Sequence, residues 1–342
     1  MSHSNEGNGT LLLSRADIAS LLTLDDCIDA VEAAFKEHAL GKSLGTGILH
    51  MDAPDGEFHI KAGGLKEPSL YFALKANAGF FSNATRFGLP NIQGLILLYS
   101  AENGRPLAVL DSLGITVKRT GAATAVAAKY LARPDSKTAT IVGCGTQGRI
   151  QLQSLSKVLP IETAHAYSIV EGEAEEFSVE MSNSLGIDVL PKTDLRGAVA
   201  SCDVCVTCTP SREFFLKEEH VRPGTFVAAV GADSPDKHEL DPHLVANSTL
   251  VVDLEEQCVD VGELHHAIGA GLMTEADVHA ELGAVIAGIS TGRTGKAEIT
   301  VFDSTGTALQ DTAATILAYE RARDSGVGQP FDFGAAPQPT QT

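Results

Sequence analysis

Hydrophobic and polar positions follow two different patterns along the chain, and the change falls near residue 116. Before it, a helical repeat that starts at Thr23 is followed by short apolar runs typical of strands, at 58–62, 71–76, 95–99 and 107–110. The last two runs flank Asn103-Gly104, a dipeptide typical of a tight hairpin. The first part is therefore predicted to form a helix followed by a largely antiparallel sheet.

After residue 116, short apolar strands alternate with helical stretches. An Ala-rich helix is expected over 121–131, and strands are expected at 138–142, 164–168, 204–207, 225–230 and 250–252. Such alternation predicts an α/β fold, with a parallel sheet covered by helices on both faces. A strand at 299–302 and a helix at about 312–323 follow. A helix at each end, outside the α/β core, indicates that both chain ends contribute to one domain.

Composition narrows the possible partners. A length of 342 residues favours two domains, and 44% hydrophobic with 20% charged residues is typical of a folded protein. The net charge of −19, with no basic patch, argues against nucleic acid as a partner. The apolar runs are too short for a bilayer, the polar start is not a signal peptide and cysteines are few, so we expect a cytoplasmic protein. Segments 2–10 and 334–342 are expected to be disordered tails.

The most informative motif follows the strand at 138–142. It reads Gly143-Cys-Gly145-Thr-Gln-Gly148, and a helix is expected to begin there. In the Rossmann dinucleotide-binding turn the first glycine permits a tight turn, the second lets the backbone approach a pyrophosphate, and the third allows close helix–strand packing. A glycine-rich connector without a ligand is the plainer alternative. The preceding strand and the alternation that follows favour the dinucleotide site.

The position that normally selects the cofactor is unusual. An acid about 20 residues beyond the turn, at the end of the next strand, usually binds the ribose hydroxyls. Here that strand ends in Ser168, and no arginine follows that would suit a 2′-phosphate. Instead come Glu171, Glu173, Glu175 and Glu176, a group that should repel a 2′-phosphate. The sequence therefore favours NAD, with NADP as the alternative.

Several stretches over about residues 11 to 325 together resemble the ornithine cyclodeaminase/mu-crystallin family. They include Leu74-Lys75, Gly88-Leu-Pro90, Lys118-Arg119-Thr120, Gly143-Cys-Gly-Thr-Gln147, 230–241, 280–283 and 301–306. The resemblance implies a Rossmann NAD(P)-binding domain over 119–306. It also implies an α+β substrate-binding and dimerisation domain from 1–118 and 307–333, and a homodimer.

The family contains enzymes with different reactions. Cyclodeaminases convert ornithine or lysine to a cyclic imino acid with release of ammonia, and the NAD is regenerated in each turnover. Asp233 favours this interpretation, with a product such as proline. The alternatives are an NAD(P)H-dependent ketimine or imino acid reductase, or an alanine-dehydrogenase-like enzyme. A third alternative is a protein that binds the nicotinamide cofactor without turnover, as mu-crystallin does.

The resemblance also implies roles for individual residues. Asp233 would be the catalytic acid/base, Lys75 a proton partner or second carboxylate contact, and Arg119 a carboxylate clamp, since its guanidinium offers two parallel donors. The residues expected to contact the cofactor are Thr120, Gly143, Gly145, Thr146, Gln147, Gly148, Ser168, Cys208, Thr209 and Lys237.

The first domain departs from the ornithine enzymes. The acid that engages the substrate amine maps to His59, an additional arginine maps near Thr46, and a threonine maps to Asn91. Lys61 stands where methionine is usual. Residues two apart on a strand share one face. His59 and Lys61 are therefore predicted, with Asn91, to bind substrate with altered selectivity, which leaves the identity of the amino acid or imino acid open.

The run Cys202-x2-Cys205-x2-Cys208 has the spacing of an iron–sulfur motif. On a strand, however, residues three apart face opposite sides. Cys202 and Cys208 would lie about 20 Å apart at about 3.3 Å per residue. No metal site is expected.

Overall fold

The computed structural model describes residues 9–333. The tail expected at 334–342 and most of the one at 2–10 lie outside the described residues, and Thr10 opens strand β1 (Thr10–Leu13) instead of ending a tail. The chain divides into two compact units. Unit 1 contains the described residues up to Thr23, Lys42–Thr116 and the described residues from Asp311, and unit 2 contains Leu24–Gly41 and Val117–Gln310.

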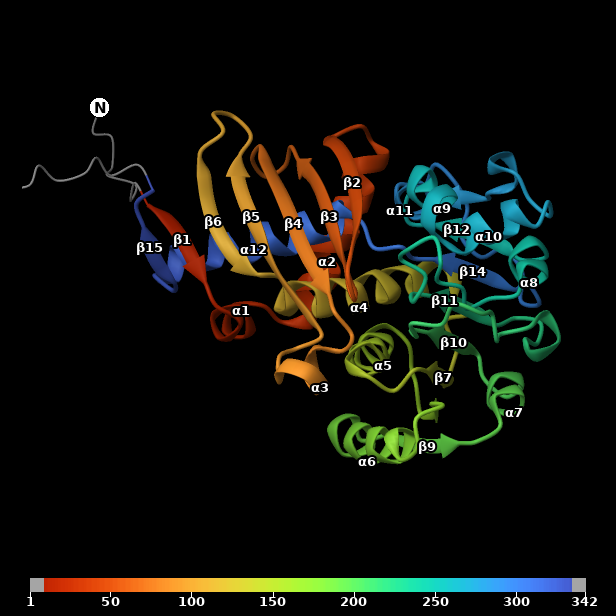
Figure 1. The fold of residues 1–342 in the computed structure, drawn as a ribbon. Helices are drawn as coiled ribbons and strands as arrows, with labels where there is room; N and C mark the ends of the chain where they lie inside the picture. The colour runs from red at the N-terminus through yellow and green to blue at the C-terminus, as the bar shows by residue number, and fades with distance from the viewer. Residues whose placement is uncertain (1–8, 334–342) are drawn as a thin grey trace, which may run out of the picture. The chain divides into compact units, whose positions relative to one another are not determined.

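Unit 1 is built on a sheet of seven strands within the described residues. They are β1, β2 (Ser43–Ala53), β3 (Gly56–Leu65), β4 (Tyr71–Gly79), β5 (Ile92–Ser100), β6 (Pro106–Asp111) and β15 (Gln329–Phe331). The order is β15-β1-β6-β5-β4-β3-β2, and only β1 and β6 run parallel. Figure 1 shows β2 to β6 side by side. The sheet is largely antiparallel, as the sequence predicts.

Three helices complete unit 1. Helix α1 (Arg15–Leu21) starts at Ser14, whose side chain and that of Asp17 form a reciprocal capping box, and α3 (Asn83–Phe87) lies between β4 and β5. Helix α12 (Ala308–Ser325) packs on the sheet over its unit 1 residues: the Thr312 hydroxyl donates to the Gly63 carbonyl over 3.2 Å, and the Tyr71 hydroxyl to Glu320 over 3.2 Å.

Strand alternation gives the sheet of unit 1 two different faces. On one face, the register places His59 opposite Asn77 and Lys61 opposite Lys75. The other face exposes large apolar side chains, with exposed fractions of 51%, 53%, 42% and 53% for Leu49, Met51, Phe58 and Leu95. The part of the first face around His59, Lys61 and Lys75 is called the polar face, and farther across the sheet the same side carries the buried Ile96 and Leu98. The other face is an apolar surface open to solvent.

Unit 2 contains an eight-stranded, fully parallel sheet within the described residues. Its strands are β7 (Thr138–Val142), β8 (Thr163–Tyr167), β9 (Asp188–Lys192), β10 (Val204–Thr207), β11 (Phe226–Ala229), β12 (Thr249–Val252), β13 (Ala280–Glu281) and β14 (Thr300–Asp303). The order is β13-β12-β14-β11-β10-β7-β8-β9, with every pair parallel. The chain turns back between β7 and β10, which is where doubly wound sheets bind ligands.

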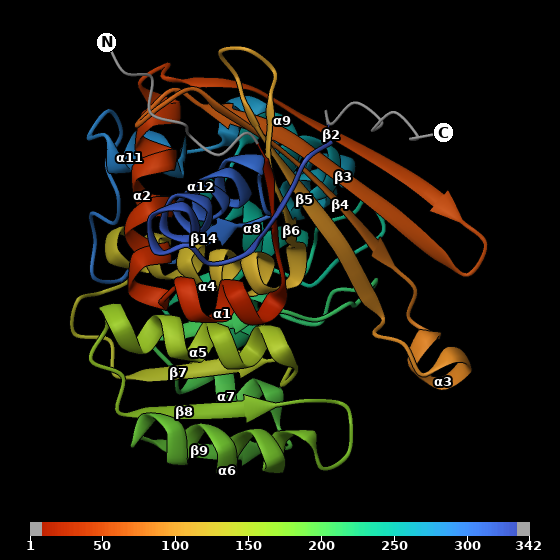
Figure 2. The same ribbon diagram turned by 90° about the vertical axis from the view of Figure 1, so that its left-hand side faces the viewer.

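Helices connect most of these strands, with α5 after β7 and α6 after β8 (Figure 2). Unit 2 contains the helices α2 (Leu24–Ala39), α4 (Ser112–Leu131, which begins in unit 1), α5 (Thr146–Val158), α6 (Glu173–Leu185), α7 (Leu195–Ala200), α8 (Pro242–Ala246), α9 (Glu255–Val261), α10 (Glu263–Gly269) and α11 (Leu282–Ile286), with 3₁₀ turns at Glu218–His220 and Glu275–Asp277. No helix in residues 9–333 is long and apolar enough to cross a bilayer. Helix α2 belongs to unit 2, whereas the sequence analysis assigned it to the first domain.

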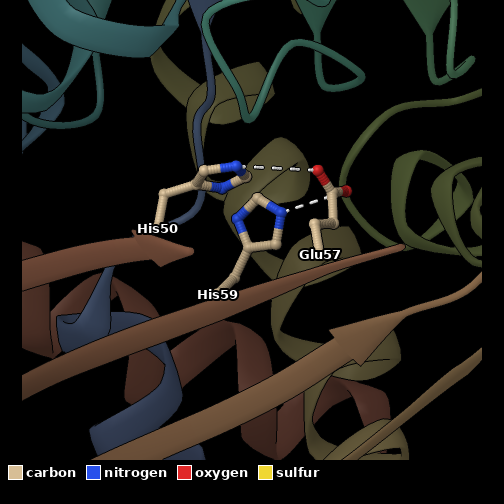
Figure 3. A group of neighbouring side chains, drawn as sticks. All are labelled: His50, Glu57 and His59. Carbon is tan, nitrogen blue, oxygen red and sulfur yellow. Dashed lines mark ion pairs between the residues drawn. The ribbon is translucent and has the colours of Figure 1, made fainter. Parts of the chain in front are cut away.

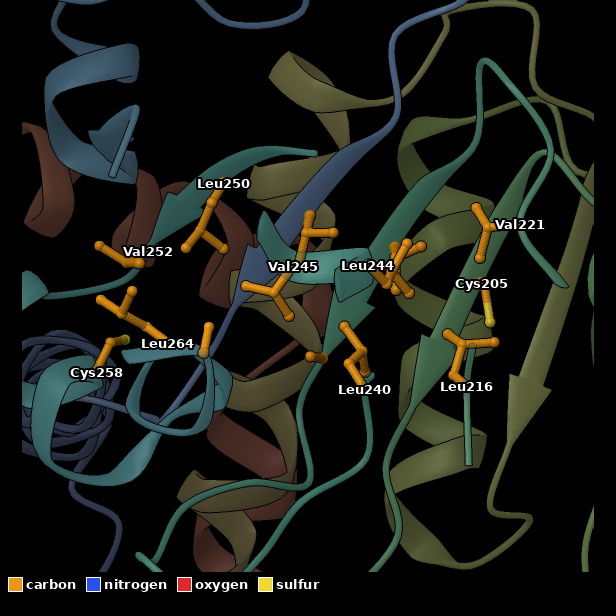
Figure 4. Packing of buried hydrophobic residues seen from close by; sticks show 14 of the residues in the cluster. Cys205, Leu216, Val221, Leu240, Leu244, Val245, Leu250, Val252, Cys258 and Leu264 are labelled. Atoms are coloured by element: carbon orange, nitrogen blue, oxygen red, sulfur yellow. The ribbon is translucent and has the colours of Figure 1, made fainter. Parts of the chain in front are cut away.

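The core of unit 2 includes Cys202 and Cys205, two of the three cysteines of the iron–sulfur-like run. Figure 4 shows Cys205 packed in a cluster of aliphatic side chains that includes Leu216 and Leu240. Cys202 and Cys205 are both fully buried there, where cysteine behaves as a small apolar residue. Burial raises the pKa of the Cys208 thiol well above its ordinary value, which keeps it protonated.

Candidate active site

The glycine turn has the backbone geometry of a dinucleotide site. Gly143 has φ +102°, and a Cβ there would lie 2.8 Å from the Cys208 carbonyl oxygen. A Cβ on Gly148 would collide with the Gly143 carbonyl oxygen. Gly145 has no atom within 4 Å of its would-be Cβ and stands at the N-cap of α5. The turn thus leaves open space at a helix N-terminus, which suits a pyrophosphate.

A carboxylate lies beside the end of β8, although the strand itself ends without one. Ser168 donates a hydrogen bond of 2.5 Å to Glu173 Oε2, in the first turn of α6. Burial and the charge of Glu173 raise the pKa of Cys144 to about 12. Cys144 is part of the glycine turn, so the Glu173 carboxylate lies close enough to affect charges at the place where the cofactor is predicted to bind.

Glu239 ties together the carboxyl ends of β10 and β11. Its carboxylate accepts hydrogen bonds from Thr209 N and Thr209 Oγ1 at 2.7 Å each, and from Thr207 Oγ1 and Gly231 N at 2.8 Å each. The side chain is fully buried, and burial raises the pKa of Glu239 against these bonds, which lower it. The sequence analysis missed Glu239. The only signal was an acid directly before the apolar Leu240.

Asp233 follows β11 on a turn, as predicted. Its carboxylate pairs with Lys237 Nζ at 2.5 Å, and the side chains are 42% and 15% exposed, respectively. The Lys237 carbonyl in turn accepts a hydrogen bond of 2.8 Å from His266 Nε2. Asp233 is thus an accessible carboxylate with a cation fixed beside it, an arrangement able to hold and pass a proton.

Arg119 on α4 is buried and tightly held. Its Nη1 donates a hydrogen bond of 2.6 Å to Gln310 Oε1, and only 5% of the residue is exposed. Gly306, with φ +75°, lies so close that a Cβ there would be 2.6 Å from Nη1. Thr120, next on α4, is also buried. Arg119 is therefore not a solvated surface cation.

The polar face of unit 1 gathers three of the predicted residues. Lys75 Nζ pairs with Asp311 of α12 at 2.6 Å, with side chains only 4% and 3% exposed. Lys61 lies opposite Lys75 and is also buried. His59, two residues before Lys61 on β3, lies opposite Asn77 on the same face. Asp311 was missed by the sequence analysis, since it stands 236 residues from Lys75 with no motif of its own.

Asn91 lies apart from this group, in the connection between α3 and β5. Its side-chain oxygen accepts a hydrogen bond of 3.0 Å from Ala84 N, and its carbonyl accepts one of 2.7 Å from Phe80 N. These contacts hold the connection around α3. A role of Asn91 toward substrate stays a prediction.

The parallel sheet with its glycine turn defines unit 2 as a Rossmann domain of the dinucleotide-binding class. Residues 8–326 match the model of the ornithine cyclodeaminase/mu-crystallin family, and the chain belongs to this family. The resemblance predicted from the sequence is thereby confirmed.

Three solved structures indicate where the chain lies within the family. An archaeal alanine dehydrogenase dimer with bound NAD is 40% identical, with TM-score 0.90, over 95% of this chain and 99% of that one. The Δ1-pyrroline-2-carboxylate reductase of Thermococcus litoralis, in complex with NADH and L-proline, is 37% identical, with TM-score 0.89, over 94% and 99%. A lysine cyclodeaminase is 29% identical, with TM-score 0.83, over 97% and 99%. The similarity is thus higher to the two oxidoreductases.

Proposed function

We propose that this protein is an NAD(H)-dependent oxidoreductase that interconverts an α-imino acid and the corresponding L-amino acid. The observation that carries the proposal is the polar face of unit 1. It presents His59 where the ornithine enzymes are expected to carry an acid for the second amine, with Lys61 and Lys75 on the same face. The acids Asp311 and Glu57 on this side are already paired, with Lys75 and His59, respectively. Such a face favours a carboxylate over a second ammonium group.

Reduction of an α-imino acid needs a hydride donor, a proton donor and cationic groups that bind the substrate carboxylate. NAD(H), when bound, supplies or accepts the hydride at the carbon of the imine. Lys61 and Lys75 are the proposed carboxylate partners on the polar face, and Arg119 keeps the role of carboxylate clamp that the family resemblance implies. Asp233, with Lys237 beside it, would give a proton to the imine nitrogen during reduction and take it back in the reverse direction.

We further propose that NAD is used in preference to NADP. The Glu173 carboxylate, oriented by Ser168, takes the place of the missing acid at the end of β8. It would accept hydrogen bonds from the ribose hydroxyls and repel a 2′-phosphate. The related oxidoreductases solved with NAD or NADH support this choice.

A cyclodeaminase remains the second candidate, and the Asp233–Lys237 pair is what favours it, because the cyclodeaminase reaction also needs an acid/base at this position. Both candidates use the same cofactor turn. In the oxidoreductase reaction, hydride is transferred net between the cofactor and the substrate. In the cyclodeaminase reaction, the hydride removed from the substrate is returned within the same turnover, so the cofactor is regenerated.

The test is a pair of assays on the purified full-length protein. In the first, NADH is mixed with Δ1-pyrroline-2-carboxylate, or with pyruvate and ammonia, and absorbance at the nicotinamide band is followed. We expect NADH to be consumed in equal amount to the amino acid formed. In the second, L-ornithine is supplied with catalytic NAD⁺, and proline and ammonia are measured. Equal amounts of both, with no NADH consumption in the first assay, would overturn the reductase proposal. Asp233→Asn should abolish whichever activity is found.

A further inference from the structure

Two histidines and a glutamate meet on the hairpin formed by β2 and β3. Figure 3 shows the imidazoles of His50 and His59 turned toward the carboxylate of Glu57. Within residues 9–333 they are the one group of three His, Cys, Asp or Glu side chains whose ligand atoms all lie within 4.8 Å of one another. No motif predicted this group, because its members come from both sides of the hairpin.

The sheet register fixes these side chains in place. His50 lies directly opposite His59, and Asp52 directly opposite Glu57, on paired antiparallel strands. Since residues two apart share a face, all four project from the same side of the hairpin. The two imidazole rings are 4.6 Å apart between centroids and meet edge to face. The cluster is therefore set by the backbone pairing, and side-chain rotations alone adjust it.

The spacing of the ligand atoms suits a small divalent ion. His59 Nε2 lies 3.1 Å from Glu57 Oε1, and His50 Nε2 lies 3.9 Å from Glu57 Oε2. Bond lengths near 2.1 Å in a tetrahedral zinc site place neighbouring ligand atoms about 3.4 Å apart. Asp52 Oδ1, 3.2 Å from His50 Nε2, stands close enough to be a fourth oxygen ligand.

We propose that His50, Glu57 and His59 bind one divalent transition-metal ion of the zinc class. Two imidazole nitrogens and one carboxylate oxygen are the donor set that suits this ion, whereas magnesium and calcium prefer oxygen alone. The side chains are 31%, 18% and 13% exposed, so an ion can enter from solvent and still be largely enclosed. The fourth position takes Asp52, water or a small anion. The proposal does not rest on the oxidoreductase function, although the cluster shares His59 with the predicted substrate site.

His59 would thus have two binding partners, the predicted substrate and the proposed metal ion. An ion bound there takes up its Nε2, so metal and substrate should compete wherever His59 contacts the substrate. His50 has no assigned role in substrate or cofactor binding. It therefore separates the metal site from the enzymatic one.

The experiment titrates Zn²⁺ into chelator-treated full-length protein by isothermal calorimetry, and Co²⁺ by visible absorption. We expect one ion per chain. The bound Co²⁺ should show the intense visible absorption of a four-coordinate ion, without the charge-transfer band that a thiolate ligand would add. His50→Gln should weaken binding at least tenfold. His243→Gln is the matched control, because His243 also pairs with an aspartate, Asp241, at 3.2 Å on the surface. It should leave binding unchanged.

Three outcomes would overturn the proposal: no stoichiometric binding, equal Zn²⁺ affinity in wild type and His50→Gln, or equal loss in both histidine variants. Glu57→Gln provides a second test if His50→Gln fails to fold, and it should also weaken binding at least tenfold. NADH-dependent turnover of metal-free His50→Gln should match the wild type. Failure of the metal site and failure of the proposed enzyme activity are therefore seen in different measurements.

Discussion

The ion pair between Lys75 and Asp311 is almost fully enclosed, with side chains 4% and 3% exposed. Taking both charges out of water is costly, and removing one partner leaves the other buried without compensation. The pair is therefore a better device for fixing the Lys75 ammonium in position than for adding stability.

Asp311→Asn should accordingly lower the free energy of unfolding by about 3 kcal/mol, the usual size for breaking a buried pair. Urea denaturation followed by circular dichroism measures it. The double variant Lys75→Met with Asp311→Leu should recover much of this loss and still lack activity. A double variant that is less stable than Asp311→Asn would show that the pair itself is strongly stabilising.

Glu173 provides a test of cofactor choice at a single carboxylate. Glu173→Gln removes the charge that is expected to repel a 2′-phosphate, so the ratio of kcat/KM for NADP to that for NAD should rise at least tenfold. Glu176→Gln, an exposed neighbour on the same helix, is the control and should leave the ratio near its wild-type value. An unchanged ratio in Glu173→Gln would rule out this role.

Residues with a local signature were predictable from the sequence, and residues defined by distant contacts were not. Gly143, Gly145 and Gly148 carry their meaning in their spacing, since the turn is built from consecutive backbone atoms. Glu239 and Asp311 acquire theirs from partners on other elements. Ser168 shows the intermediate case: its departure from the pattern was visible, but its partner Glu173 could not be singled out from four nearby glutamates.

At the scale of elements, four hydrogen bonds to the Glu239 carboxylate link the carboxyl end of β10 to that of β11. In a glutamine side chain only the amide oxygen can accept hydrogen bonds. The NH₂ group would replace the second carboxylate oxygen and would point its hydrogens at groups that also donate. Glu239→Gln should therefore raise KM for the cofactor at least fivefold and lower stability by about 2 kcal/mol. Steady-state kinetics and denaturation measure both. Loss of stability with an unchanged KM would reduce Glu239 to a purely structural role.

The stacked pair of His238 and His266, with ring centroids 3.8 Å apart, makes stability depend on pH. Burial and the neighbouring His266 lower the pKa of His238 to about 4, against 6.5 for the free side chain. Between these values the unfolded chain binds more protons, so this stabilisation is present above pH 6.5 and is lost as pH falls toward 4. The slope is at most about 1.4 kcal/mol per pH unit.

His238→Gln removes this titration, so its free energy of unfolding should fall less steeply than that of the wild type from pH 6.5 to 4. Buried Asp303, whose pKa burial raises to about 7, contributes the opposite slope from pH 4 to 7 in both proteins. The informative quantity is therefore the difference between the two pH profiles. Parallel profiles would contradict the assignment to His238.

Elements were predictable where hydrophobic alternation is strong. Strand β7 has the predicted bounds, because its last four residues are buried and it lies between β10 and β8 in the sheet. Strand β2 was missed, since Gly45, Thr46 and Gly47 interrupt any pattern and the strand exists through its pairing with β3. Helix α4 begins at Ser112, nine residues before the predicted start, because the Ala-rich stretch is only its later part.

At the scale of the whole molecule, the apolar face of unit 1 predicts self-association. Leu49, Met51, Phe58 and Leu95 are each more than 40% exposed on one face of the sheet. A second copy of this chain is the expected partner, because the family resemblance implies a homodimer.

Phe58→Asp should shift the protein from dimer to monomer, because a charge would have to be desolvated in the interface. Sedimentation equilibrium measures the change. Val179→Asp, at a 65% exposed apolar position on α6, is the control and should remain dimeric. A dimer of unchanged affinity in Phe58→Asp would place the interface elsewhere.

The order of synthesis gives the Lys75–Asp311 pair a further consequence. The ribosome delivers the six strands β1 to β6 first, then nearly all of unit 2, and α12 and β15 last. Lys75 is therefore made more than two hundred residues before the carboxylate that neutralises it. Until then its ammonium has to stay in water, so the polar face of unit 1 cannot close around it. The nascent chain completes its inserted unit 2 before unit 1, which becomes native only as the last helix leaves the ribosome.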